Sequence, residues 1–92
     1  MIVRILTEGQ YDVSDEALSR LNQLDAAVEA AISVGDAPAF DAALAALLDG
    51  VRTIGVPRAA DSLDESDVIL PPADATIDDV RAMLGGDGLI PG

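Results

Sequence analysis

Residues 14–55 read SDEALSRLNQLDAAVEAAISVGDAPAFDAALAALLDGVRTIG, and this stretch decides the fold. Apolar side chains recur at helical spacing in both of its halves, which are separated by Gly35 and Asp36. A glycine followed by an aspartate ends one helix and caps the next. The pattern predicts two antiparallel helices, residues 15–34 and 37–54, joined by a tight turn. The apolar positions are Leu18, Leu21, Leu24 or Asp25, Val28 and Ile32, then Phe40, Leu44, Leu47, Leu48, Val51 and Ile54.

Capping residues and a glycine refine this helical pair. Ser14 is a favourable N-cap for the first helix, and Pro38 is tolerated in the first turn of the second. Gly50 lies inside the second pattern, where glycine costs about 1 kcal/mol relative to alanine. We therefore expect Gly50 to allow another backbone to come close.

Short apolar segments outside the helical pair predict a small sheet. Residues 2–6 are rich in β-branched side chains and predict a strand, with which the buried segment 68–70 can pair. Residues 7–10 have the composition of a turn, and residues 11–13 are expected to form a brief return strand. Residues 56–67 are expected to form a surface loop.

A third, shorter helix is predicted over residues 77–84. Thr76 precedes it and Asp79 follows three positions later, the spacing of a capping box with Asp in place of Glu. Gly85 and Gly86 end the pattern. The expected fold class is α+β and predominantly helical. It comprises an αα-hairpin, a short third helix, and a minimal sheet from the N-terminal strand and the strand near residues 68–70.

Length and sequence ends set the expected organisation and location. A chain of 92 residues is expected to form one domain, residues 1–92. Met1 leads into the first strand without the pattern of a signal peptide, and no apolar stretch approaches the roughly 18 residues that span a bilayer. We expect a cytoplasmic protein without direct membrane insertion.

The charge balance excludes several classes of function. Formal net charge is −12, from 17 acidic residues against five arginines. A nucleic-acid binder or a protein docked on an anionic membrane needs a basic surface, which this composition does not supply. With Tyr11 and Phe40 as the only aromatic residues, platforms for base stacking are also excluded. The acidic charge either favours a basic protein partner or serves solubility alone.

Side chains for catalysis and metal binding are scarce. The sequence contains no His, Cys or Lys, which removes the usual bases, nucleophiles and transition-metal ligands. The densest acidic cluster lacks the spacing and the glycine of a calcium loop, so it is either a solvated loop or a site for a hard cation. We expect no enzymatic activity and no cofactor. The cluster comprises Asp61, Asp64, Glu65 and Asp67.

Four residues are candidates for contact with a partner: Tyr11, Asp74, Leu89 and Ile90. Tyr11 is either an interface anchor or a cover for the edge of the core. Asp74 is either an exposed contact beside a helix start or a local acceptor for the N–H groups of a turn. Leu89 and Ile90 either pack on the core or stay exposed as a binding site. The stripe of helix 37–54 packs on the first helix or on a partner helix.

Three segments together carry a family resemblance. Residues 2–11 read IVRILTEGQY, residues 68–76 read VILPPADAT, and residues 88–92 read GLIPG. In this order the chain resembles PspAA, the phage-shock-protein-A-associated domain of actinobacteria and archaea. The resemblance runs from Met1 to Gly92, and its specificity lies in the order and spacing of short segments.

The resemblance implies a non-enzymatic, largely trihelical domain that accompanies PspA. PspA is a long coiled-coil protein that is related to membrane-remodelling ESCRT-III proteins and serves envelope-stress responses. The family is associated with an important aspartate, which the motif assigns to Asp74. A member is expected to bind or regulate PspA, and through it to reach the inner face of the membrane.

Our leading hypothesis is therefore a cytoplasmic adaptor or regulator that docks on PspA. An alternative is an acidic inhibitor that mimics nucleic acid and blocks a basic protein, which requires carboxylates in a regular double row. A further alternative is a metal-dependent enzyme that uses the carboxylates. The sequence leaves open whether the protein forms a homodimer and whether it activates or inhibits its partner.

Overall fold

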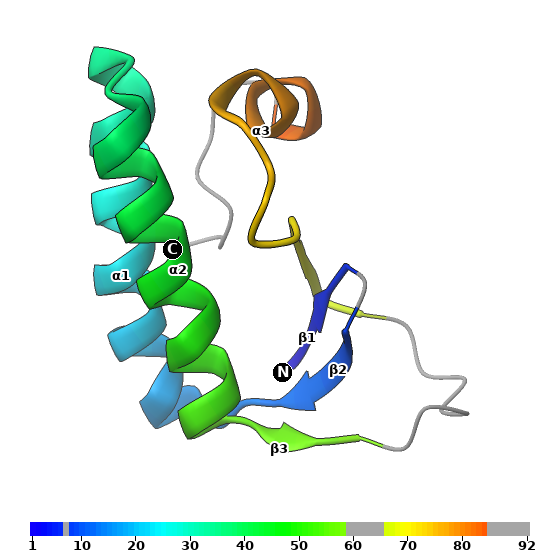
Figure 1. The fold of residues 1–92 in the computed structure, drawn as a ribbon. Coiled ribbons are helices and arrows are strands. Elements are labelled where there is room, and N and C mark those ends of the chain that lie inside the picture. The colour runs from blue at the N-terminus through cyan, green and yellow to red at the C-terminus, as the bar shows by residue number, and fades with distance from the viewer. Residues whose placement is uncertain (7, 59–65, 85–92) are drawn as a thin grey trace.

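A computed structural model describes residues 1–6, 8–58 and 66–84, without the side chains of residues 83 and 84. A helical hairpin forms one layer and a small sheet the other, and a short helix lies above the sheet, beside the end of the hairpin where its two helices are joined (Figure 1). This arrangement confirms the predicted fold class. The elements are β1 (Ile2–Ile5), β2 (Gly9–Asp12), α1 (Asp15–Val34), α2 (Ala37–Ile54), β3 (Val56–Pro57), β4 (Val68–Leu70) and α3 (Ile77–Leu84).

Local capping fixes the bounds of the two long helices, which are those predicted. The Ser14 hydroxyl accepts a hydrogen bond from the Ala17 amide at 3.2 Å, which begins α1. Gly35 ends it with a left-handed φ of 72°, a conformation that glycine adopts without steric cost. The Asp36 carboxylate then accepts from the Ala39 amide at 3.1 Å and begins α2.

The apolar stripes of α1 and α2 face each other and the sheet. At the position where the sequence allowed Leu24 or Asp25, Asp25 is buried and Leu24 is half-buried. A Cβ atom added to Gly50 would lie 2.7 Å from Leu24 Cδ1 and 3.4 Å from Leu21 Cδ2. Gly50 thus makes room for side chains of α1, and the prediction that it lets another backbone come close is wrong.

The sheet has four strands in the order β3-β2-β1-β4. β1 pairs antiparallel with β2 and parallel with β4, so the predicted pairing of residues 2–6 with 68–70 is present. Two details differ from expectation. β2 starts at Gly9 and ends at Asp12, and the expected loop after residue 55 begins with strand β3, which pairs with β2.

The inner face of the sheet closes the core against the hairpin. Val3 and Ile5 of β1, with Val68 and Leu70 of β4, point inward and are almost fully buried. They belong to one cluster of buried apolar residues that includes Phe40 of α2. The alternation of buried and exposed positions along β1 and β4 leaves the opposite face of the sheet turned away from the helices.

α3 is held in place by its N-terminal cap, by one buried side chain and by one hydrogen bond to a residue far away in the sequence. Thr76 and Asp79 form the predicted capping box, with each amide donating to the other side chain at 3.0 and 3.1 Å. Val80 is fully buried in the core. Arg81 Nη2 donates to the Ile32 carbonyl at 2.8 Å, which brings a cation to the C-terminal turn of α1. Within the described part of the chain, no helix is long and apolar enough to cross a membrane.

Candidate functional site

Tyr11 lies on β2 and packs against the core. Its cross-strand neighbours are Val3 of β1 and Pro57 of β3, and Val3 is buried on the inner face. The Tyr11 Cβ would lie 3.0 Å from a Cβ atom added to Gly55, so β2 and the end of α2 approach closely here. The ring is half-buried at the edge of the core, and a role as a partner contact stays a prediction.

Asp74 is exposed in the turn between β4 and α3. The Ala75 amide donates to the Pro72 carbonyl at 3.1 Å and closes this turn through the backbone. Among the described residues, no hydrogen bond or ion pair involves the Asp74 carboxylate. The strand that carries Tyr11 and the strand that precedes Asp74 are separated by β1, because β2 and β4 pair with its two opposite edges. Leu89 and Ile90 lie outside the described residues.

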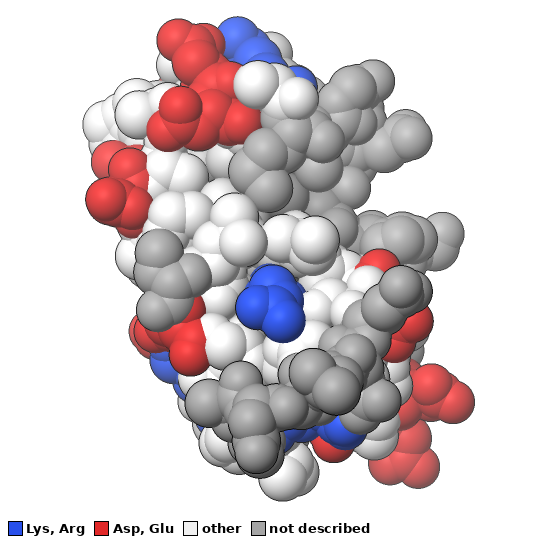
Figure 2. Space-filling view, turned by 90° about the vertical axis from the view of Figure 1, so that its right-hand side faces the viewer, with Lys and Arg blue, Asp and Glu red and all other residues white. Residues whose placement is uncertain are grey.

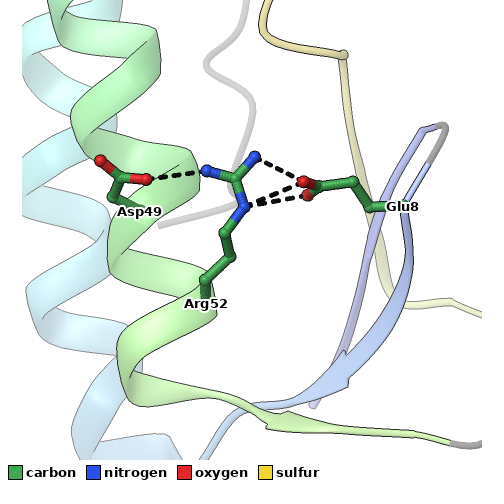
Figure 3. A network of polar contacts seen from close by, with 3 residues as sticks. All are labelled: Glu8, Asp49 and Arg52. Carbon is green, nitrogen blue, oxygen red and sulfur yellow. Dashed lines mark hydrogen bonds and ion pairs between the residues drawn. The ribbon is translucent and has the colours of Figure 1, made fainter.

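An ion-pair network joins the β1–β2 turn to α2 (Figure 3). Arg52 Nη2 lies 2.7 Å from Glu8 Oε1, and Arg52 Nε donates to both Glu8 carboxylate oxygens at 3.0 and 3.1 Å. Arg52 Nη1 contacts Asp49 Oδ1 at 2.8 Å. The hydrogen bond with Glu8 is the main cause that raises the pKa of Arg52, against the opposing effect of desolvation.

Many of the acids in the described residues have structural roles. Asp12 pairs with Arg58 at 2.6 Å and ties β2 to the end of β3. The Asp67 carboxylate accepts from the Ile2 amide at 2.8 Å, at the start of the β1–β4 pair. With Glu8, Asp49 and the two caps, at least six carboxylates of the described residues bond other groups of the chain: Glu8, Asp12, Asp36, Asp49, Asp67 and Asp79.

The sheet presents a face that points away from the hairpin, and we call it the outer sheet face. It is formed by Arg4 and Leu6 on and just after β1, Gln10 on β2, and Ile69 on β4. Arg4 lies directly opposite Gln10 on one side and Ile69 on the other. Leu6 is 36% exposed and Ile69 is 49% exposed, so both present apolar surface on this face.

Figure 2 views the molecule from this side. A basic side chain lies in the middle of an uncharged area, and acidic side chains lie toward its margins. The strand register places Arg4 on this face. Arg4 Nε donates to the Ser66 hydroxyl at 3.3 Å, and Gln10 Nε2 donates to the same oxygen at 2.9 Å. The accessible part of the face thus combines apolar side chains with an arginine, while Gln10 beside it is buried.

A second surface feature is an open cleft of about 350 Å³ between the α1–α2 turn and α3. It is lined on one side by Phe40 and Asp41 and on the other by Ile77, Asp78 and Arg81. The Arg81 cation already serves the C-terminus of α1, so its charge is committed to the fold. Of the candidate contact residues that the structure describes, neither Tyr11 nor Asp74 lines this cleft.

The described residues contain no group of three or more His, Cys, Asp or Glu side chains that could hold a metal ion. Of the acidic cluster predicted over residues 61–67, only Asp67 is described, and its carboxylate bonds the Ile2 amide. What the described residues do present is the outer sheet face, where the exposed side chains of Leu6 and Ile69 lie beside Arg4.

The fold and this face define a small two-layer α+β protein with an exposed, mixed apolar and polar surface. The chain belongs to the PspAA family, because the family model described as PspA-associated protein matches residues 1–92. Comparison with curated proteins and with solved structures finds no significant match.

Proposed function

We propose that this protein is a non-enzymatic adaptor that binds PspA and regulates it in the envelope-stress response. The observation that carries the proposal is the family match over residues 1–92, since the family is described as PspA-associated. The net charge of −12 supports a partner with a basic surface, because opposite charges accelerate encounter and fix orientation. Recruitment to the inner face of the membrane would then occur through PspA.

The nucleic-acid mimic is the weaker proposal on the observed contacts. A mimic needs free carboxylates in regular rows to replace phosphates. At least six carboxylates of the described residues instead bond amides or arginines of the same chain, and they come from the sheet and its connections, from α2 and from the caps of α2 and α3. We therefore base the functional proposal on PspA alone.

The test is a binding measurement between the purified protein and purified PspA from the same organism. We expect a complex in calorimetry and in co-elution, and weaker binding as salt rises from about 0.1 to about 0.5 M, because screening reduces the contribution of the acidic surface. An unrelated coiled-coil protein is the control. Absence of a complex at micromolar concentrations, or equal binding to the control, would contradict the proposal.

A further inference from the structure

Arg4 differs from most arginines of the described residues. Arg52 and Arg58 form ion pairs with carboxylates of the chain, and Arg81 donates to the carbonyl end of α1. Among the described residues, the Arg4 side chain forms one hydrogen bond, from Nε to the Ser66 hydroxyl, and no ion pair. The N–H groups on its two Nη atoms therefore donate no hydrogen bond to the residues that the structure describes. Among the arginines and acids that the structure describes, Arg4 therefore stands apart from Arg52 and Arg58, which both pair with a carboxylate.

The surroundings of Arg4 strengthen its capacity for a charged contact. It is half-buried, with Ile69 beside it across the β1–β4 pair and Leu6 two positions along the same strand. Apolar neighbours lower the local dielectric constant, so a carboxylate that docks here gains more than it would on a wet surface. Arg20 also has no ion pair among the described residues, but it is exposed on α1.

We propose that the outer sheet face binds a segment of PspA that carries one carboxylate among apolar side chains. The carboxylate accepts from the Nη groups of Arg4, and the apolar side chains pack on Leu6 and Ile69. Basic residues at the ends of the segment meet the acidic margins seen in Figure 2. This inference deepens the proposed function and rests on it.

Charge argues against a second copy of this chain as the occupant. Packing two outer sheet faces about a twofold axis would bring two Arg4 cations together, because a twofold interface joins the same patch on both subunits. It would also join two chains that each carry a net charge of −12. A partner segment that is basic at its ends and carries one acidic residue at its centre fits both the Arg4 cation and the negative charge of the whole chain.

The experiment compares two substitutions on the face with two matched ones elsewhere. Arg4→Gln removes the charge and keeps an amide that can reach the Ser66 hydroxyl. Ile69→Glu places a negative charge, of the same sign as the partner's carboxylate, in the apolar part of the face. Arg20→Gln and Val34→Glu make the same chemical changes on α1, where Val34 is 77% exposed. Circular dichroism and thermal melting confirm that each variant folds before its Kd for purified PspA is measured by calorimetry.

We expect Arg4→Gln and Ile69→Glu each to weaken binding roughly 10- to 100-fold, since each loses a contact at the centre of an interface. The α1 controls should stay within about twofold. A photocrosslinker at position 69 should capture a PspA segment with an acidic residue between apolar ones. Arg4→Glu should bind again when that acid is changed to arginine.

The failures of this inference and of the proposed function are distinguishable. If the wild type and the folded Arg4→Gln and Ile69→Glu variants bind PspA with the same affinity, this inference is overturned and the proposed function stands. Absence of wild-type binding would overturn both. Self-association of the protein alone that Ile69→Glu abolishes would assign the face to a second copy and overturn the inference.

Discussion

At the scale of single residues, the contact between Glu8 and Arg52 joins the two layers of the fold (Figure 3). Both side chains are about one-third exposed, at 33% and 35%, so solvent screens the pair. We expect a double-mutant cycle with Glu8→Gln and Arg52→Gln to give a coupling free energy of about 0.5–1 kcal/mol. Urea denaturation at low salt measures it, and the coupling should shrink at high salt.

The second acid in this network supplies the control. Asp49 is 73% exposed and lies three positions before Arg52 on α2, so Asp49→Asn should cost only a few tenths of a kcal/mol. The raised pKa of Arg52 means that its contribution is complete below the unfolded pKa and is lost only as pH rises through the higher folded pKa. That window is strongly alkaline, so salt is the useful variable. Equal effects of Glu8→Gln and Asp49→Asn would contradict the assignment.

At the scale of elements, Gly50 sets how closely α2 can lie to α1. A Cβ atom at this position would meet Leu24 Cδ1 at 2.7 Å, but that methyl ends a half-buried, flexible side chain. Gly50→Ala should therefore be near neutral, because a small shift of Leu24 is offset by about 1 kcal/mol of helix propensity. Gly50→Leu adds more atoms than the shift can accommodate, and should lower the free energy of unfolding by about 1–3 kcal/mol.

Chemical denaturation measures both changes, with Ala46→Leu as the control one turn earlier on α2. Ala46 is exposed, so this substitution adds the same side chain where no neighbour has to move. We expect it to change stability by less than about 0.5 kcal/mol. A Gly50→Leu protein as stable as the wild type would mean that the hairpin can open at this point without loss of packing.

The helices could be predicted from sequence because their signals are local. Ser14, Gly35 and Asp36 act within one turn of where they stand, and they fixed the bounds of α1 and α2. β3 was missed because Val56 and Pro57 form a strand only through contact with β2, more than 40 positions earlier. Two residues carry no alternation that a pattern could detect.

At the scale of the whole molecule, the outer sheet face was only partly visible in the sequence. Arg4 stands in a predicted strand, and the pairing of that strand with residues 68–70 was expected. The strand register places Arg4 opposite Ile69, and this register depends on the complete fold. The same is true of the observation that no carboxylate of the described residues pairs with Arg4. Residue type and motif point to Tyr11 and Asp74, but they do not report exposure or mutual position.

The net charge of −12 is a property of the whole molecule, and it predicts how stability responds to salt. Repulsion among 17 acids opposes the compact state, and ions screen it. If screening removes about 1 kcal/mol of this repulsion from the folded state, Tm should rise by about 4–8 °C between about 0.01 and 0.5 M NaCl. The loss of the weaker Glu8–Arg52 attraction acts in the opposite direction and is smaller.

MgCl2 and CaCl2 at matched ionic strength provide the comparison, because screening alone gives similar increases in Tm for all three salts. A Tm that falls with NaCl would contradict dominance by repulsion. A much larger rise with a divalent cation would instead reveal a bound ion, and would direct attention to the acids of residues 61–67.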